Sequence, residues 1–369
     1  MSKKIVILHP AYWEQAMGGA EQQIYCLITY LIKQGCDVFY IFEDKGTVYK
    51  NELNINLCPL KKIGINKRFG NRWFLYRRSL NQVLEKIQPD IIYTRFFSSW
   101  SGIASEYTKK NKCKHIWALA SDNDVDRLND KTPFSKPLDL IEKKWVRKAY
   151  LHADAIITQN VFQQKKIHNN YGREGILITQ SASVCEEDSI IKQDIPIKVL
   201  WIANLKALKQ PQIFIELVKR FSNQTNVHFT MIGRSNKDFI KLVGQADSSF
   251  QNFKYLGELT NNEVNEYLSQ SHILVNTSEY EGFSNTFVQA WMRKVVVISM
   301  SSNPDEILTK QQIGFLCENV DEMEKTIISL IKHPDQIKEK GQKAFKYASK
   351  NHSLEKNLSI VLKLMGINE

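Results

Sequence analysis

Short apolar runs alternate with amphipathic helical segments along most of this chain. The apolar runs are rich in valine and isoleucine, which is typical of buried strands in a parallel sheet. They fall at residues 5–8, 38–42, 90–96, 115–120, 155–158, 198–203, 228–233, 272–276 and 295–299. Between them, apolar residues at helical spacing predict helices over residues 18–35, 138–153, 211–221 and 261–270.

This alternation predicts an α/β fold, and the length of 369 residues suits two domains. We expect two doubly wound Rossmann-like domains, an N-terminal one over residues 1–184 and a C-terminal one over residues 197–350. The polar, acidic segment 185–196 ends in a proline and is predicted to link them. Residues 351–369 are predicted to form a C-terminal helix that packs back on the N-terminal domain.

Basic residues are concentrated in the first half of the chain. Residues 1–185 hold 28 Lys and Arg against 17 Asp and Glu, whereas residues 186–369 hold 22 of each, so the net charge of +11 belongs to the first half. The excess is densest in residues 61–80, which combine seven basic residues with Trp73, Phe74 and Tyr76 and contain no acidic one. Such a run is either a solvated face or a patch for an anionic acceptor or an anionic membrane surface.

The candidate acceptor or membrane contacts in this stretch are Lys67, Arg68, Arg72, Trp73, Arg77 and Arg78. Nucleic acid is not an expected partner, because no recognition motif accompanies the basic patch.

Several other chemistries lack their motifs. A dinucleotide-binding domain should show GxGxxG after its first strand, and that turn instead holds Gly18-Gly19; no Walker loop occurs in the sequence. The acidic loop at residues 122–126 offers oxygen ligands, but Arg127 and Pro133 stand where a calcium loop needs glycine and glutamate, so no metal is expected. The six cysteines form no CxxC pair and indicate free thiols in a reducing cytoplasm.

Residues 277–299 carry the strongest chemical signal. Between two predicted strands the segment reads, in order, Glu279, Glu281, Gly282, Phe283, Ser284, Asn285 and Thr286, followed by an apolar helical run. The N-terminus of that helix offers unpaired N–H groups to a phosphate. The carboxylate of Glu281 cannot favour a phosphate by charge, so its expected partner is a hydroxyl-rich group, and a sugar attached to a diphosphate fits both halves. The alternative is that the two glutamates only cap the helix.

Five motifs together suggest a family. They are, in order, Gly-Gly-Ala-Glu at residues 18–21, the block at 201–217, Met-Ile-Gly-Arg at 231–234, the block at 256–264 and Glu-Gly-Phe at 281–283. Over nearly its whole length the chain resembles the retaining glycosyltransferases with the GT-B fold, of the large family-4 type that includes bacterial lipopolysaccharide, capsule and exopolysaccharide sugar transferases. The resemblance implies two Rossmann-like domains facing across a cleft, with the donor mostly on the second.

The resemblance also implies that a lysine and an arginine neutralise the departing diphosphate. Lys209 matches the lysine, while Asn204 stands at the arginine position, so compensation by Lys206 or Arg234 is expected. The alternative for Lys209 is an ordinary surface lysine. The donor-binding residues implied in this way are Gly18, Gly19, Asn204, Lys209, Gly233, Arg234, Glu281, Gly282, Phe283, Ser284, Asn285, Thr286 and Gln289.

Members of this family carry two glutamates separated by seven residues. The first matches Glu281, which is expected to contact hydroxyls of the donor sugar. The second position is Gln289, which keeps an oxygen to accept the ribose hydroxyls but lacks the charge, so weaker nucleotide binding is expected. The alternative for Gln289 is a solvent-facing helix position.

Many relatives also carry a histidine of the first domain near the reacting carbon. Ser121, Asp122 and Asn123 occupy that place here. His9, at the carboxyl end of the first predicted strand, is therefore a catalytic candidate, together with Asp122, Glu281 and Lys209. The alternative for His9 is an ordinary core histidine.

We therefore expect a retaining hexosyltransferase-type enzyme that needs no metal or cofactor and works in the cytoplasm or on the inner membrane face. It would move a sugar from a UDP- or GDP-linked donor to a glycan or lipid-linked acceptor in cell-surface polysaccharide synthesis. One alternative is a nucleotide-sugar epimerase or hydrolase of the same fold. Another is a catalytically weakened nucleotide-sugar-binding partner protein, prompted by Asn204, Gln289 and the missing histidine.

Overall fold

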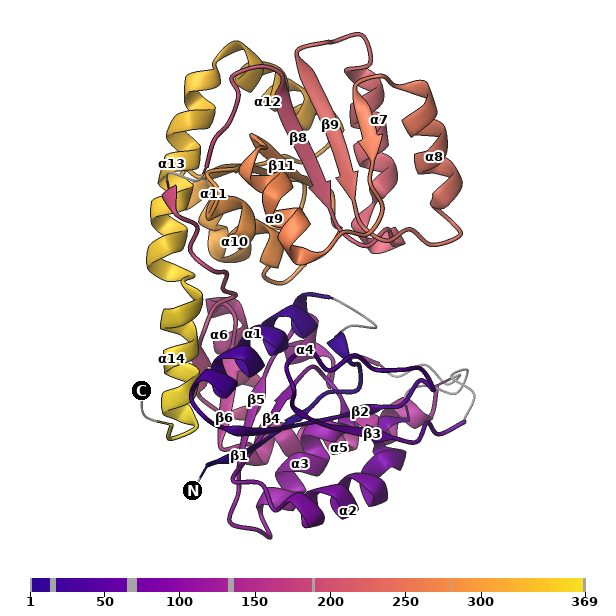
Figure 1. Ribbon diagram of the computed structural model, residues 1–369, viewed down its shortest axis with the longest axis vertical. Helices are drawn as coiled ribbons and strands as arrows, with labels where there is room; N and C mark the ends of the chain where they lie inside the picture. The colour runs from indigo at the N-terminus through magenta and orange to yellow at the C-terminus, as the bar shows by residue number, and fades with distance from the viewer. Residues whose placement is uncertain are drawn as a thin grey trace. The chain divides into compact units, whose positions relative to one another are not determined.

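The computed structural model describes residues 2–13, 18–64, 72–131, 136–187, 190–279 and 281–367. The chain forms two compact units, one of Met1–Thr179 with Glu355–Glu369 and the other of Gln180–Leu354. Each is built around its own parallel sheet flanked by helices (Figure 1). The predicted fold class, two doubly wound Rossmann-like domains, is confirmed. Segment 185–196, predicted as a linker, falls inside the second unit.

The first unit holds a seven-stranded sheet in the order β3-β2-β1-β4-β5-β6-β7. Its strands are β1 (Lys4–Leu8), β2 (Asp37–Glu43), β3 (Asn56–Leu60), β4 (Ile91–Arg95), β5 (Lys114–Ala118), β6 (Ala155–Thr158) and β7 (Gly175–Leu177). Its helices are α1 (Gly19–Lys33), the 3-10 helix η3 (Trp73–Tyr76), α2 (Arg77–Ile87), α3 (Ser99–Thr108), α4 (Asn123–Asp126), α5 (Leu138–His152) and α6 (Val161–Tyr171). Figure 1 shows α1 on one side of this sheet and α2, α3 and α5 on the other.

The C-terminal segment packs on the first unit. The predicted single helix over residues 351–369 is instead the end of α13 (Pro334–Asn351) followed by α14 (Leu354–Leu364). Lys3 Nζ donates to the carbonyl of Met365 at 3.1 Å, and Asn357 Nδ2 donates to the carbonyl of Thr179 at 2.9 Å. These bonds attach α14 to both ends of residues 1–179.

The second unit holds a six-stranded sheet in the order β10-β9-β8-β11-β12-β13. Its strands are β8 (Ile197–Ile202), β9 (Val227–Ile232), β10 (Phe253–Tyr255), β11 (Ile273–Asn276), β12 (Val296–Ser299) and β13 (Gly314–Leu316). Its helices before α13 are η5 (Ala207–Lys209), α7 (Pro211–Arg220), α8 (Ile240–Ser249), α9 (Asn261–Ser269), α10 (Asn285–Trp291), η6 (Pro304–Glu306), α11 (Ile307–Lys310) and α12 (Val320–Lys332).

Alternate residues of the second sheet feed two separate cores. Val199 and Trp201 of β8 pack in one cluster with α7, α8 and α12, whereas Leu200 between them packs in another with α9, α10, α11 and α13. Side chains of a strand point to opposite faces in turn, so a strand covered on both faces reads as an unbroken apolar run. This explains why the central strands are visible in the sequence.

Both sheets reverse their strand order at one internal pair of neighbours. The reversal lies between β1 and β4 in the first unit and between β8 and β11 in the second. In open α/β sheets the connections leave on opposite faces at such a point, which opens a crevice beyond the carboxyl ends of the two strands. Ligand-binding residues are therefore expected at these two strand reversals.

Candidate active site

Lys209 and Glu281 meet at the strand reversal of the second unit. Lys209 follows β8 in η5, and Glu281 follows β11. The Lys209 ammonium lies 2.8 Å from Glu281 Oε1, and Asn276 Nδ2 donates to Glu281 Oε2 at 2.8 Å. The two charged side chains are 22% and 17% exposed, so both are accessible to a ligand from solvent while most of their surface is packed against the protein. Two of the four predicted catalytic residues are thus in direct contact.

The loops that carry this pair are bound to each other. Thr277 Oγ1 donates to the carbonyl of Lys209 at 2.7 Å and accepts from Trp201 Nε1 at 2.9 Å. The backbone N–H of Glu279 donates to the carbonyl of Leu208 at 2.9 Å. Because Trp201 and Thr277 are themselves buried, the Lys209 and Glu281 backbones rest on the packed core of the unit.

The turn from Glu281 into α10 presents backbone more than side chains. Ser284 is the N-cap residue of α10, and its Oγ lies 2.8 Å from Thr286 Oγ1. The ring of Phe283 is buried, with its centroid 6.2 Å from that of Trp291 and 5.1 Å from that of His352. The Phe283 ring is therefore unavailable to a donor, and the predicted donor contact at this position stays a prediction for its backbone.

Glycine is required where the β8 and β9 loops approach each other. Gly233 has φ +146, and a Cβ there would lie 1.8 Å from the carbonyl oxygen of Ala203. Next to it, the carbonyl of Arg234 accepts from the N–H of Leu205 at 2.9 Å. The Asn204, Gly233 and Arg234 positions therefore lie on two adjoining loops. The Arg234 side chain is half exposed, 3.9 Å from Glu258.

Gln289 is buried and faces α9. Its Nε2 donates to Asn261 Oδ1 at 2.7 Å and to Asn265 Oδ1 at 3.3 Å. The alternative of a solvent-facing glutamine is therefore wrong. The side-chain amide belongs to a polar cluster of three residues between α9 and α10.

His9 lies at the strand reversal of the first unit. Its Nδ1 is 2.9 Å from the carbonyl of Arg95, at the end of β4, and its Nε2 is 3.1 Å from Glu21 Oε1. The Arg95 carbonyl can only accept, so Nδ1 donates to it, while Nε2 faces the Glu21 carboxylate. Burial opposes ionisation of Glu21, but the hydrogen bond and charge of His9, together with the backbone N–H groups of Glu21 and Gly18, outweigh it and lower the pKa of that carboxyl.

The Gly-Gly turn lies beside this pair. Gly18 is the N-cap residue of α1, Gly19 begins the helix, and Glu21 is in its first turn. A Cβ on Gly18 would lie 2.7 Å from Glu21 Oε2. Phe96, directly after Arg95, has φ +113, an uncommon conformation for a bulky residue and one that is often found at functional sites.

Asp122 is held by amides at the end of the same sheet. Its Oδ1 accepts from Asn160 Nδ2 and from Gln163 Nε2, both at 2.8 Å. Nearby, burial raises the pKa of Asp124 to about 6, although the N–H groups of Ala120 and Ser121 favour its charged form. Across the ranges that the structure describes, no three His, Cys, Asp or Glu side chains gather as a metal site would require.

Two family models match the chain on either side of the unit boundary. The model described as Glycosyltransferase Family 4 matches residues 17–178, and the model described as Glycosyl transferases group 1 matches residues 196–333. Between them they span the Gly-Gly turn, the Lys209 loop and the Glu281 turn. The chain belongs to the family-4 glycosyltransferases with the GT-B fold.

Solved structures resemble this glycosyltransferase over nearly its full length. Anabaena HepE in complex with UDP and glucose is 16% identical, with a TM-score of 0.73 over 99% of both chains. Sucrose-phosphate synthase from Thermosynechococcus elongatus is 14% identical, with a TM-score of 0.78 over 98% of both chains. WaaG, a glycosyltransferase involved in lipopolysaccharide biosynthesis, is 12% identical, with a TM-score of 0.73 over 97% of this chain and 99% of its own. At these identities the likeness shows the fold.

A sequence relative matches a smaller part of the glycosyltransferase. Trehalose synthase from Pyrococcus horikoshii is 29% identical over 105 residues, which is 28% of this chain. The match spans only 25% of that relative's own length.

In the described part of residues 61–80, some of the basic and aromatic side chains of this glycosyltransferase are turned inward. Tyr76 is fully buried and its hydroxyl donates to Glu43, and the Trp73 ring packs 5.8 Å from that of Trp100. Arg72 is 9% exposed, so its predicted contact with a membrane surface is wrong, and the buried Tyr76 ring is likewise unavailable to such a surface.

The remaining basic residues of that stretch differ in their surroundings. Arg77 pairs with Glu106 at 3.1 Å and lies over the Trp145 ring, so the stretch, which contains no acidic residue of its own, has an acidic neighbour in α3. Arg78 is exposed, while Lys67 and Arg68 lie outside the described residues. No helix in the described ranges is long and apolar enough to cross a bilayer.

Sequence reasoning missed the residues that hold the candidates in place. Asn276 orients Glu281, Glu21 holds His9, and Asn261 with Asn265 binds Gln289. Glu21 is the last residue of the Gly-Gly-Ala-Glu motif, so its spacing after the first strand was a usable signal. No local pattern marks the three asparagines.

Proposed function

We propose that this protein is a retaining glycosyltransferase that moves a sugar from a UDP- or GDP-linked donor to a glycan or lipid-linked acceptor. The observation that carries the proposal is the Lys209–Glu281 pair, a cation and a carboxylate held together at the strand reversal of the second unit. Family membership supports the reaction type, and the UDP and UDP-glucose bound to HepE support a nucleotide-sugar donor.

In this proposal Lys209 serves the leaving group. When the bond between the sugar's anomeric carbon and the diphosphate breaks, negative charge grows on the diphosphate oxygen. A cation already positioned there stabilises the transition state more than the ground state, typically by ~2–4 kcal/mol for one such group. Asn204 supplies no second positive charge, so Arg234 on the adjoining loop is the proposed substitute.

Glu281 is proposed to bind the sugar. A carboxylate accepts hydrogen bonds from hydroxyl groups, and Asn276 fixes one of its oxygens. When a diphosphate draws the Lys209 ammonium, Oε1 of Glu281 becomes available to a sugar hydroxyl. The backbone of Gly282 to Thr286 would then meet the phosphates, and Gln289 with Asn261 and Asn265 would meet the ribose.

The first unit is proposed to serve the acceptor. The new bond forms between the acceptor oxygen and the anomeric carbon on the face that the diphosphate leaves, and the acceptor proton passes to the departing phosphate oxygen. His9 and Asp122 lie at the carboxyl edge of that unit's sheet, where an acceptor hydroxyl would be oriented. We place the enzyme in cell-surface polysaccharide synthesis, in the cytoplasm or on the inner membrane face, with no metal or cofactor.

Membrane attachment has its own test. The exposed basic residues in the described part of residues 61–80 are Lys61, Lys62, Arg77 and Arg78, and Lys67 and Arg68 also belong to this stretch. If this stretch meets anionic lipid, the protein sediments with anionic vesicles at low salt, not with neutral ones, and salt releases it, because each basic residue contributes about 1 kcal/mol. Equal sedimentation with both vesicle types, or with neither, contradicts the membrane proposal and leaves the acceptor proposal in place.

The reaction itself is tested by donor binding followed by turnover. A donor present at 100 times its dissociation constant should raise the unfolding free energy by about 2.7 kcal/mol, so a thermal-shift panel of nucleotide sugars should single out one base and sugar. Release of that nucleotide should then depend on added acceptor, and the product should keep the donor's anomeric configuration. Inversion overturns the retaining mechanism, and acceptor-independent release indicates a hydrolase. Binding of a nucleotide sugar without any release favours a catalytically weakened nucleotide-sugar-binding protein. That alternative is supported by Asn204, which stands where the family has an arginine.

A further inference from the structure

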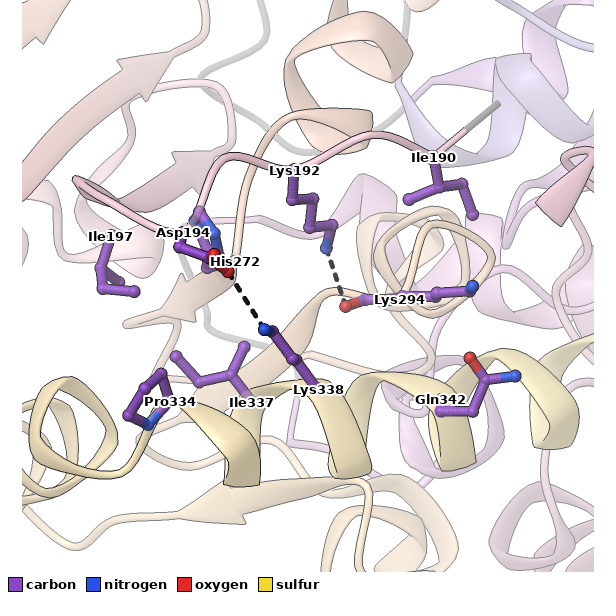
Figure 2. A pocket seen from close by; sticks show the side chains of 10 residues that line it. All are labelled: Ile190, Lys192, Asp194, Ile197, His272, Lys294, Pro334, Ile337, Lys338 and Gln342. Atoms are coloured by element: carbon purple, nitrogen blue, oxygen red, sulfur yellow. Dashed lines mark hydrogen bonds and ion pairs between the residues drawn. The ribbon is translucent and has the colours of Figure 1, made fainter. Parts of the chain in front are cut away.

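A cavity of about 270 Å³ lies in the second unit at the edge of the sheet opposite the Lys209–Glu281 pair. Its floor comes from the starts of three strands, because Ile197 opens β8, His272 precedes β11 and Lys294 precedes β12. Segment 190–194 and the N-terminal turns of α13 close its sides (Figure 2). None of these residues belongs to the loops that follow the carboxyl ends of the strands.

Three lysines line this cavity, and two of them have a carboxylate partner. Lys338 Nζ lies 3.1 Å from Asp194 Oδ1, and Lys294 Nζ lies 2.8 Å from Glu187 Oε1. Lys192 Nζ instead donates to the carbonyl of Lys294 at 2.8 Å. Figure 2 shows Lys192 and Lys338 extending toward the cavity from opposite sides.

Lys192 is poorly compensated among the described residues. Burial, reinforced by the positive charge of Lys294, lowers the pKa of Lys192 to about 7. A lowered lysine pKa means that the surroundings disfavour the ammonium, and a neighbouring anion would reverse that.

The rest of the lining adds apolar surface but no further positive charge. His272 Nδ1 accepts from the N–H of Lys198 at 3.0 Å, and its Nε2 is 2.9 Å from the carbonyl of Gln193, so the ring is neutral with its hydrogen on Nε2. Burial and the charge of Lys192 lower the pKa of His272 to about 4. The apolar lining consists of Ile190, Ile197, Pro334 and Ile337.

We propose that this cavity binds a small organic anion, with a phosphate or carboxylate headgroup beside Lys192 and a short apolar body against the isoleucines. Among the described residues, Lys294 pairs with Glu187 and Lys338 with Asp194, whereas Lys192 pairs with no carboxylate, so the lining favours an anion over a cation. A volume just below the ~300–1,000 Å³ of ordinary ligand pockets suits a small metabolite better than a nucleotide sugar. The proposal does not rest on the proposed transfer reaction, since no residue of this cavity takes part in it.

Protection of Lys192 from an acetylating reagent tests the proposal directly. A bound anion stabilises the ammonium and covers it, so less free amine reacts, and mass spectrometry of the Lys192 peptide reports the rate. The probes are butyl phosphate and butyrate, with inorganic phosphate, butanol and sodium chloride at matched ionic strength for comparison. Lys343, on the outer part of α13, provides the internal reference.

We expect butyl phosphate, butyrate or both to slow acetylation of Lys192 at least tenfold while Lys343 is unaffected. Whichever acts more strongly identifies the headgroup. Inorganic phosphate should act at least tenfold more weakly, and butanol and sodium chloride should not act. No protection by either organic anion, or equal protection by sodium chloride, overturns the proposal. If inorganic phosphate protects Lys192 as strongly as butyl phosphate does, the isoleucine surface does not contribute to binding, and that part of the proposal is wrong.

Two variants locate the site. Lys338→Ala removes an exposed cation from the cavity, so half-protection of Lys192 should need several-fold more butyl phosphate, whereas Lys343→Ala on the same helix should change nothing. Lys192→Met should abolish the thermal shift caused by the effective probe, while a nucleotide that stabilises the wild type still stabilises the variant and shows it to be folded. A probe shift that survives Lys192→Met contradicts the assignment.

Discussion

Glu281 has its two carboxylate oxygens held by two different side chains, Lys209 and Asn276. We expect Glu281→Ala and Lys209→Ala each to lower kcat about 10²–10³-fold, because each removes one group that contacts the donor in the proposed reaction. The unfolding free energy should fall by about 1–3 kcal/mol, because each substitution leaves the partner charge unpaired at a site only 22% and 17% exposed. Turnover assays together with thermal unfolding separate the two effects.

Glu279→Ala is the matched control for these variants. Glu279 is exposed, lies two residues before Glu281, and contributes to the loop through its backbone N–H. Its side chain should therefore be dispensable for transfer. A near wild-type rate in Glu281→Ala or Lys209→Ala means that the donor site has been assigned to the wrong place.

Gln289→Glu tests the proposed ribose contact. The charged oxygen should accept hydroxyl hydrogen bonds more strongly, so UDP or GDP should bind several-fold more tightly while transfer remains. A carboxylate cannot donate, so the Asn261 and Asn265 amides must turn to donate to it. Isothermal titration calorimetry measures the change. Weaker binding of both nucleotides by a folded variant counts against a ribose at this position.

Helices α3 and α5 approach each other closely at a glycine, Gly102, whose role in this contact can be tested by a single substitution. A Cβ on Gly102 of α3 would lie 1.9 Å from the carbonyl oxygen of Trp145 on α5. Gly102→Ala should force the helices apart and destabilise the first unit by roughly 1–3 kcal/mol. Thermal unfolding should show the loss, and nucleotide binding by the second unit should persist.

Gly244→Ala is the corresponding control in a helix without a close neighbour. Gly244 lies in α8, and a Cβ there meets no atom within 4 Å. Alanine should stabilise this helix by about 0.5–1 kcal/mol. If both substitutions shift the melting temperature in the same direction, the close approach of α3 and α5 is not what Gly102 serves.

The unfolding free energy of the whole protein should fall as the pH is lowered from 6.5 towards 4, before most carboxylates take up protons. Burial lowers the pKa of His115 in the first unit to about 3 and that of His352 in the second to about 4; burial and Lys192 lower that of His272 to about 4. The unfolded chain therefore binds protons that the folded chain does not between pH 6.5 and 4. Stability is present above pH 6.5 and falls across that window, by on the order of 2–3 kcal/mol per histidine.

Calorimetry from pH 7.5 to pH 4.5 checks this expectation for both units. Asp124 acts in the opposite sense, because its pKa is raised to about 6 and the folded chain takes up its proton first. Asp124→Asn should therefore steepen the fall for the first unit. A melting temperature that stays constant from pH 6.5 to pH 4.5 contradicts the burial of these histidines as neutral rings.

The sequence was sufficient for the elements whose pattern is local. All nine predicted strands are present, and so are the helices predicted at residues 18–35, 138–153, 211–221 and 261–270 and after Glu281, because a central parallel strand is apolar on both faces and a long helix shows its period. The single helix predicted over residues 351–369 is instead divided between α13 and α14. The short edge strands β3, β7, β10 and β13 were not predicted. Three to five residues with one covered edge carry too little periodicity, and Pro59 stands within β3.

Residue identity and motif spacing were also enough to select Lys209 and Glu281, which are 72 residues apart, and His9. That they meet partners at the two strand reversals was decided by the order of strands in each sheet, which no local pattern records. The basic stretch shows the same limit. Its composition suggested a surface, but the fold buries Tyr76 and Arg72 and sets Glu106 beside Arg77. Charge and side-chain type are properties of the chain, whereas burial and partner depend on segments that only tertiary packing brings together.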